Sequence, residues 1–444
     1  MRVRNLAGTL AMLLLSVAAG AALLEAVVRL FDLFPEPRRA TSDESAPTER
    51  PADAPALSTV VHPYLGWSRR PTAPLRTPVP LERTFPDGLP SDWYQRNNRV
   101  NAFGFRSEIE DYREVSEDDF VIGIFGGSVA NQLVLLGGDS IVATLSERWP
   151  ELDGRIRILN FGLGGYKQPQ QTILLLEMIL LGVPFDVVVN LDGFNEIALG
   201  AGDAAAGHHP IFPYRGFHLR TVEFSSGQPT PAAIELSAAI LKARRESRRW
   251  REWLAAGPGR SELVAALVGL RLQVLERRVA EAERALQDPS QAGRVAAVAR
   301  IDAPCLGEGF ACWRLIADLW ERSSRAMAAL AREESALYLH VLQPHQYLEG
   351  SKRLTAEERR VAYDPGHPWS RAVARGYPHL QRRAPRLSQA GIRFHDLTGV
   401  FRGSSETLYQ DTCCHFNARG GRILGAEVAR LIDESVTPPL RSSP

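Results

Sequence analysis

The feature that most constrains the fold is an alternation of short apolar segments with helical ones. Five apolar runs, each bounded by turn residues, have the length of buried strands: Phe120 to Phe125, Ile156 to Phe161, Asp186 to Leu191, Ala336 to Leu342, and Gly391 to Leu397. Segments with helical spacing lie between them, including Ser140 to Trp149 and Gln170 to Leu181. Strands that alternate with helices predict a parallel sheet covered on both faces. We therefore expect a doubly wound α/β fold whose site lies beyond the carboxyl ends of the strands.

The first 35 residues predict a membrane anchor. Arg2 and Arg4 precede an apolar run from Leu6 to Leu24. This run of about 19 residues is close to the length that crosses roughly 30 Å of hydrocarbon. Positive charge ahead of the run keeps the amino terminus inside, so the rest of the chain is expected to be periplasmic or extracellular. A cleaved signal peptide and a buried helix are the alternatives.

Two other regions depart from the α/β pattern. Residues 36–83 are rich in Pro, Ala, Ser, Thr and charge, which predicts a linker before a main domain at 84–444. Within that domain the alternation breaks at about 200–325. There, Ile234 to Trp253 and Ser261 to Leu286 have helical spacing and predict an inserted helical hairpin or lid. Its Arg-rich faces indicate either solvated surface or a binding surface for an acidic partner.

Composition narrows the class of function. The chain has 444 residues, 45% of them hydrophobic, and a net charge of +1, so a nucleic-acid surface is not expected. Four cysteines occur, at 305, 312, 413 and 414, and they form no C-x-x-C pair. In an exported chain Cys305 and Cys312 could close a short loop, whereas the adjacent Cys413 and Cys414 are poorly placed to bond each other. Buried free thiols are the alternative.

A serine follows the first predicted strand in the sequence Gly126-Gly127-Ser128. A serine there would lie at the sheet edge, near a helix amino terminus whose N–H groups stabilise developing negative charge. The simpler interpretation is a tight turn with a helix cap. The pattern is not the G-x-S-x-G elbow of the α/β-hydrolases.

Glycine-rich turns also follow the next two strands. The second strand leads into Asn160 to Tyr166, where glycines let the backbone approach a bound group. Neither a Walker motif nor a G-x-G-x-x-G fingerprint is completed there, so nucleotide binding is not predicted. After the third strand, Asn195 could donate a side-chain hydrogen bond to an oxyanion, or simply belong to a turn.

Near the carboxyl terminus, Asp411 precedes His415 in a loop that leads into a predicted helix. A histidine with an acid nearby suits a general base and its orienting group.

These four blocks fall in the order of the SGNH (GDSL-like) hydrolase superfamily, which the chain resembles from Phe120 to Leu199 and from Ala336 to Leu431. The resemblance implies a flavodoxin-like three-layer fold, with Ser128 as nucleophile, His415 as base and Asp411 as its orienter. It also implies an oxyanion hole formed by the Ser128 and Gly165 N–H groups and the Asn195 side chain. Gln343 and His345, after the fourth strand, resemble pocket segments of exported members, although a surface-loop histidine is the alternative.

Two positions depart from the family pattern. Gly127 replaces the usual aspartate of the first block. Thr412 stands where the family has its acid, three residues before the histidine, and Asp411 lies one residue further back. If the loop bulges by one residue, Asp411 can reach His415. If it does not, Thr412 or a backbone carbonyl takes that place. Asp396 is another acid that follows a strand closely.

The sequence therefore predicts a membrane-anchored serine hydrolase that acts on a carbohydrate or lipid O-acyl ester and uses no cofactor. It contains no H-E-x-x-H motif or dense carboxylate cluster, so no metal is expected. Two alternatives remain open. One is an O-acyltransferase acting on an exported polysaccharide, and the other is a catalytically inactive scaffold of the cell envelope.

Overall fold

The computed structural model describes residues 59–71, 81–205, 207–214, 216–217, 231–255, 262–287, 305 and 309–436. The predicted anchor, residues 1–35, lies outside the described residues, as do residues 36–58 and 72–80 of the predicted linker. The chain divides into two compact units. The α/β body comprises Pro55–Ser226 and Ala297–Pro444, and the second unit contains the described helices within Gly227–Ala296.

The body is built on a parallel sheet of five strands. In chain order they are β3 (Phe120–Gly126), β4 (Ile156–Gly162), β5 (Val187–Asp192), β6 (Leu337–Leu342) and β7 (Arg393–Asp396). Each overlaps one of the predicted apolar runs. Their spatial order, β4-β3-β5-β6-β7, is that of flavodoxin-like folds, in which the chain reverses direction across the sheet beside the first strand. The predicted doubly wound α/β fold is confirmed.

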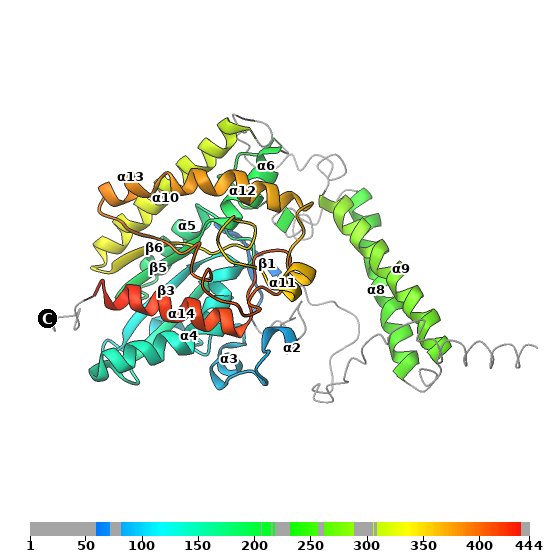
Figure 1. The fold of residues 1–444 in the computed structure, drawn as a ribbon, viewed down its shortest axis with the longest axis horizontal. Helices are drawn as coiled ribbons and strands as arrows, with labels where there is room; N and C mark the ends of the chain where they lie inside the picture. The colour runs from blue at the N-terminus through cyan, green and yellow to red at the C-terminus, as the bar shows by residue number, and fades with distance from the viewer. Residues whose placement is uncertain are drawn as a thin grey trace, which may run out of the picture. The chain divides into compact units, whose positions relative to one another are not determined.

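Helices cover both faces of this sheet (Figure 1). One layer contains α4 (Ser128–Arg148) and α14 (Ala418–Asp433), with the short α3 (Asp92–Asn97) against α4. The other contains α5 (Gln170–Leu180), α6 (Phe194–Ala205), α10 (Phe310–Glu333), α12 (Pro368–Gln381) and α13 (Ala384–Gln389). The remaining short helices of the body are α2 (Leu81–Thr84), α11 (Ala356–Val361), η1 (Tyr112–Glu114) and η2 (Pro150–Leu152).

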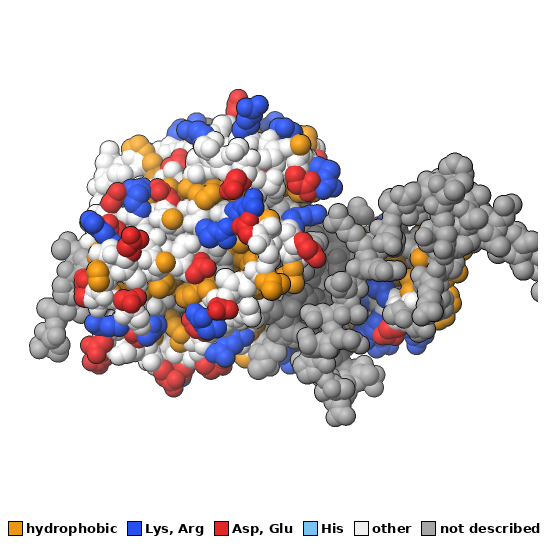
Figure 2. Space-filling view, turned by 60° about the horizontal axis from the view of Figure 1, so that its bottom comes forward, with side chains coloured by type: hydrophobic (Ala, Val, Ile, Leu, Met, Phe, Trp, Pro, Cys, Tyr) orange, Lys and Arg blue, Asp and Glu red, His pale blue; other side chains and the backbone are white. Residues whose placement is uncertain are grey.

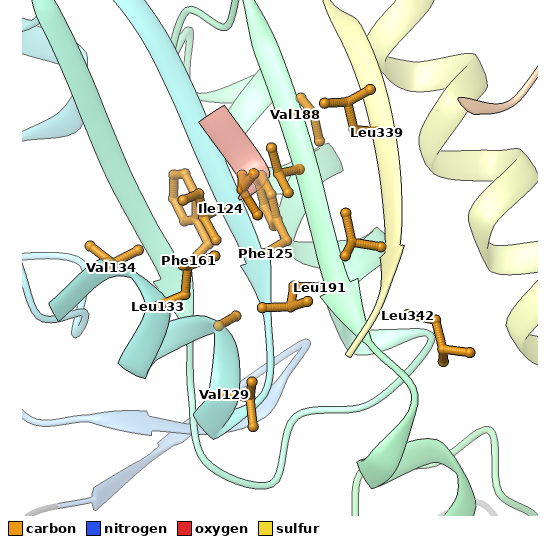
Figure 3. Close-up of a cluster of buried hydrophobic side chains, with 14 of the residues drawn as sticks. Ile124, Phe125, Val129, Leu133, Val134, Phe161, Val188, Leu191, Leu339 and Leu342 are labelled. Atoms are coloured by element: carbon orange, nitrogen blue, oxygen red, sulfur yellow. The ribbon is translucent and has the colours of Figure 1, made fainter. Parts of the chain in front are cut away.

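The core lies between the sheet and its helices (Figure 3). Phe125 of β3 and Phe161 of β4 are fully buried, and their stacked rings have centroids 4.5 Å apart. Leu133 of α4 is also fully buried in this cluster. Burial of each such side chain stabilises the fold by roughly 1.5–3 kcal/mol. Because the strands are apolar on both faces, they read in the sequence as continuous runs.

The α4 and α14 helices touch backbone to backbone through glycines. A Cβ atom on Gly425 would lie 2.3 Å from the carbonyl oxygen of Gly137, and one on Gly421 would lie 2.5 Å from that of Leu136. Neither contact leaves room for a side chain. Glycine is therefore required at these positions for the close approach of the two helices.

The structure corrects the linker prediction for residues 59–69. They form an antiparallel hairpin of β1 (Thr59–His62) and β2 (Gly66–Arg69). Trp67 is buried, and its carbonyl oxygen accepts a hydrogen bond of 2.6 Å from the Tyr166 hydroxyl. The Leu65 carbonyl accepts another, of 2.6 Å, from the side-chain amide of Gln170. These two contacts attach the hairpin to the body, although the surrounding composition resembles a linker.

The helical insertion predicted at about 200–325 spans fewer residues in the structure. Its start belongs to α6, and residues 310–325 belong to α10, where Trp313, Ile316 and Trp320 are buried. The second unit contains α8 (Pro231–Ala255) and α9 (Glu262–Gln287), which pack against each other. Glu246 on α8 and Arg271 on α9 form an ion pair of 2.6 Å between them.

The charge and the hydropathy of the described residues mark no further functional region. On the face shown in Figure 2, basic and acidic side chains of the described residues are interspersed. One helix of the described chain, α4, has the length and mean hydropathy of a membrane span. Most of its side chains are nevertheless buried inside the body, as expected of a core helix.

The glycine contact between α4 and α14 should be essential for stability. Gly425→Ala places a methyl group against the Gly137 carbonyl, and overpacking of this kind typically costs about 1–3 kcal/mol. We expect the urea unfolding midpoint to fall accordingly. Gly202→Ala on α6 is the matched control, since a Cβ there meets nothing within 4 Å. Alanine in a helix is stabilising by about 0.5–1 kcal/mol over glycine. Equal midpoints for the two variants would contradict the packing argument.

Candidate active site

Ser128 lies where β3 passes into α4. Gly126 has φ +151°, and a Cβ on it would lie 2.1 Å from the Leu191 carbonyl oxygen, so the turn requires glycine. Gly127 is the N-cap, and Ser128 is the first residue of the helix. The Ser128 N–H therefore has no acceptor within the helix and points from its positive end.

The carboxyl-terminal loop brings His415 to this serine. His415 Nε2 lies 2.8 Å from Ser128 Oγ, and His415 Nδ1 lies 2.6 Å from Asp411 Oδ2. The other carboxylate oxygen, Asp411 Oδ1, accepts hydrogen bonds from the backbone N–H groups of Cys413 and His415, at 3.0 and 3.3 Å. The loop thus bulges at Thr412, and the three predicted residues form one continuous hydrogen-bonded chain.

The other acid considered, Asp396, has different partners. Its carboxylate accepts hydrogen bonds from the side chain of Gln381, at 2.8 Å, and from the Thr398 hydroxyl, at 2.6 Å. Of the two acids, Asp411 is therefore the one that is hydrogen-bonded to His415.

The charges around His415 favour its protonated form. Burial lowers the pKa of His415, but the electrostatic effects of Cys413 and Asp411 and the hydrogen bond that the ring donates to Asp411 outweigh it and raise the pKa to about 9. Burial raises the pKa of Asp411, yet the neighbouring His415 and the hydrogen bonds of the loop lower it overall. Asp411 therefore stays ionised and stabilises an imidazolium.

Asn195 lies beside the serine on the first turn of α6. Its side-chain amide donates a hydrogen bond of 2.7 Å to the Tyr166 carbonyl oxygen. A Cβ on Gly127 would lie 2.2 Å from the same amide nitrogen. A side chain at position 127 would therefore displace the Asn195 amide. An amide has two hydrogens, and one remains for a bound oxyanion.

Gly165, the other predicted oxyanion donor, immediately precedes Tyr166 and has φ +84°. Its N–H finds no hydrogen-bond acceptor in the part of the chain that the structure describes. A Cβ there would lie 2.7 Å from the Phe217 ring, so the position is closed to larger residues.

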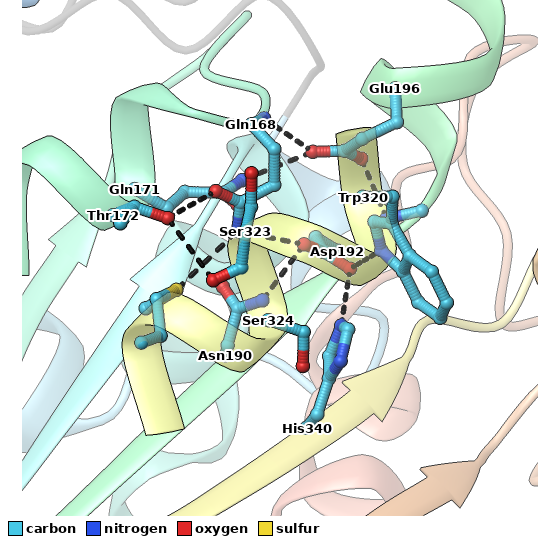
Figure 4. Close-up of polar contacts among 12 residues, drawn as sticks. Gln168, Gln171, Thr172, Asn190, Asp192, Glu196, Trp320, Ser323, Ser324 and His340 are labelled. Atoms are coloured by element: carbon cyan, nitrogen blue, oxygen red, sulfur yellow. Dashed lines mark hydrogen bonds and ion pairs between the residues drawn. The ribbon is translucent and has the colours of Figure 1, made fainter. Parts of the chain in front are cut away.

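A buried hydrogen-bond network was missed by the sequence analysis (Figure 4). This network joins the loop after β4 to the turn after β5. The Glu196 carboxylate accepts hydrogen bonds from the backbone N–H groups of Gln168, at 2.9 Å, and Gly193, at 2.8 Å. Burial and the nearby Asp192 raise the pKa of Glu196 to about 8. Asp192 itself accepts from Trp320 Nε1 at 2.6 Å and lies 3.0 Å from His340 Nε2. The sequence signal that could have indicated this network is the pair of acids, Asp192 and Glu196, on either side of the turn that follows β5.

Gln343 and His345, the predicted pocket residues, are buried beneath the site. Their exposed fractions are 3% and 0%, so the alternative of a surface-loop histidine is wrong. Burial lowers the pKa of His345 to about 3, which keeps the ring neutral. Its ring packs on Phe194 at a centroid distance of 4.7 Å.

The cysteines fall into two pairs. Cys305 and Cys312 form a disulfide, and Cys413 and Cys414 are free, with sulfur atoms 3.2 Å apart. The donor atoms of Cys413, Cys414 and His415 lie within 4.8 Å of one another, a soft-metal set by chemistry. Both nitrogens of His415 are engaged by Ser128 and Asp411, so we assign this histidine to the serine.

Comparisons with known proteins give only distant similarity. No family model matches the chain, and no curated protein matches it. Among solved structures, it is similar to LAE5, an alpha/beta hydrolase enzyme from the metagenome of Lake Arreo, Spain, at 13% identity and a TM-score of 0.31, over 73% of this chain and 97% of that one. It is also similar to a catalytic mutant of Axe2, an acetylxylan esterase from Geobacillus stearothermophilus, at 12% identity and a TM-score of 0.32, over 75% of this chain and 100% of that one. These two neighbours are a hydrolase and an esterase.

Proposed function

We propose that the chain is an SGNH-type serine hydrolase that cleaves an ester through an acyl-enzyme. The observation that carries the proposal is the continuous arrangement of Ser128, His415 and Asp411, with contacts of 2.8 and 2.6 Å. Such a chain supplies a nucleophile, a base in reach of its proton, and a group that fixes the base. It argues against an inactive scaffold, for which no such alignment is needed.

In the proposed mechanism His415 takes the proton from Ser128 Oγ as this oxygen attacks the ester carbonyl. The N–H groups of Ser128 and Gly165 and the remaining amide hydrogen of Asn195 stabilise the tetrahedral oxyanion. His415 then donates its proton to the departing alcohol. Water, activated by His415 in turn, attacks the acyl-enzyme and releases the acid. Asp411 remains ionised throughout.

The substrate class and location extend this proposal. Carbohydrate or lipid O-acyl esters suit the resemblance to SGNH hydrolases and an exported location. The disulfide between Cys305 and Cys312 supports export, since such bonds persist outside the cytoplasm. We propose that the amino-terminal apolar run anchors the body to the membrane from outside.

The first test is labelling of the serine. A fluorophosphonate should label the protein on Ser128 alone, and faster as the pH rises toward about 9, because only this serine combines a base with oxyanion donors and the base must be neutral. Peptide mapping locates the label, and a panel of short-chain aryl esters measures turnover. Ser128→Ala should abolish both, with Ser140→Ala as a control on the same helix. Labelling that persists in Ser128→Ala would remove the proposal.

The second test concerns Asp411. Loss of the acid's charge lowers turnover by about 10⁴ in the serine protease triad, and we expect Asp411→Asn to lower kcat/KM by more than about 10²-fold. Because the reaction needs neutral His415, wild-type kcat/KM should rise with pH toward about 9. The asparagine variant loses the carboxylate that raises this pKa, so its rise should occur at lower pH. Thr412→Val is the control, and near-normal activity in Asp411→Asn would contradict the triad.

The third test concerns topology. A reporter active only outside the cytoplasm, fused after Pro444, should be active if residues 6–24 direct export. Deletion of residues 2–35 should abolish this activity. Activity of a cytoplasmic reporter at the same position would contradict export, and would leave the hydrolase proposal standing.

A further inference from the structure

The loop that carries Asp411 and His415 packs on a buried segment that has no part in the proposed mechanism. This segment follows β6 and contains His345, Gln346 and Tyr347, of which Gln346 is 4% exposed and Tyr347 is 7% exposed. Polar side chains this deeply buried need hydrogen-bond partners. Both find them in the loop that carries Asp411 and His415.

The contacts run along three consecutive backbone carbonyls. Gln346 Nε2 lies 3.0 Å from the Asp411 carbonyl oxygen and 3.3 Å from that of Cys413, as well as 3.1 Å from that of Ala362. The Tyr347 hydroxyl donates a hydrogen bond of 2.9 Å to the Thr412 carbonyl oxygen between them. It also accepts one of 3.1 Å from the Asp364 N–H, which fixes its orientation.

The same loop is held from its other side by its own acid. Asp411 Oδ1 accepts the N–H groups of Cys413 and His415. The N–H groups of the loop thus converge on Asp411, while its carbonyls converge on Gln346 and Tyr347. This two-sided set of bonds accommodates the extra residue, Thr412, that separates the acid from the histidine.

We propose that Gln346 and Tyr347 are positioning residues that hold the loop in the bulged form in which Asp411 reaches His415. This inference rests on the proposed function, since it explains how an acid in a shifted register still serves the base. In the described part of the chain neither side chain forms a hydrogen bond with Ser128 or His415, so both act through Asp411.

His345 supports the same segment. Its Nδ1 accepts a hydrogen bond of 3.2 Å from the Tyr347 N–H, and its carbonyl oxygen accepts one of 2.8 Å from the Ser351 hydroxyl. The titratable groups that act on His415 are Asp411 and Cys413 of its own loop, while His345 below it stays neutral. The segment therefore shapes the loop without adding a charge to it.

The experiment compares two conservative variants with a matched control. Tyr347→Phe removes only the hydroxyl, and Gln346→Met keeps the side-chain length but removes the donor. Tyr347→Phe loses one hydrogen bond to the loop, and Gln346→Met loses the contacts with two loop carbonyls, so we expect a fall of about tenfold or more in kcat/KM on an activated ester for each variant. Tyr338→Phe removes another buried hydroxyl, one that lies 3.3 Å from the Ser324 hydroxyl, and should leave kcat/KM unchanged.

Combination with Asp411→Asn separates positioning from stability. If Tyr347 acts through the acid, Tyr347→Phe should change kcat/KM by less than about twofold once the acid's charge is gone. An equal loss in both backgrounds would show a merely structural role and overturn the proposal.

A measurement without substrate keeps the two proposals apart. Proton NMR should show His415 titrating at lower pH in Tyr347→Phe and Gln346→Met than in wild type, because the Asp411 contact that raises its pKa is loosened. An unchanged titration midpoint in both variants would overturn the positioning role. A wild-type protein that cleaves no ester but shows these shifts would refute only the proposed function.

Discussion

The backbone contact between α4 and α14 is the constraint on which the site depends. Ser128 is the first residue of α4, and His415 lies just before the Asn417 cap of α14. Both helices start at the same edge of the sheet, so their separation sets the distance between nucleophile and base. Glycines at 137, 421 and 425 permit backbone contact, and a side chain there would push the helices apart. The 2.8 Å bond from serine to histidine is thus fixed by packing remote from it.

The region proposed as the oxyanion hole depends on buried acidic side chains. Glu196 ties the turn after β4 to the turn after β5 by accepting one N–H group from each, and Asp192 ties the same region to Trp320 on α10. Buried carboxylates are costly unless they are hydrogen-bonded, and these are. The cost is offset by turns whose donors are held in place before a substrate arrives, which is what electrostatic stabilisation of a transition state requires.

Much of this arrangement could be predicted because it depends on residue patterns within short segments of the sequence. Buried parallel strands are apolar on both faces, so they appear in the sequence as continuous apolar runs, and the blocks that contain Ser128 and Asn195 follow two of these runs directly. The missed parts depend on contacts between distant segments. The sequence pattern places residues 310–325 in the helical insertion, yet Trp320 packs into the core of the body. The role of Glu196 could not be predicted, because its carboxyl joins two turns that are separate in the sequence and adjacent in the fold. The bulge at Thr412 was one of two possible outcomes, since the bonds from Gln346 and Tyr347 come from another strand end.

The place of the helical unit in the chain has an evolutionary consequence. It is inserted between α6 and α10, two neighbouring helices of one layer, and a Cβ on Gly200 would lie 3.4 Å from the Ile316 side chain. The two helices that flank the insertion in the sequence are therefore neighbours in the body, and neither is a strand or one of the turns that carry the site. Segments attached in this way are gained, lost and exchanged at little cost to the host domain. The insertion is therefore the natural place to graft a foreign domain.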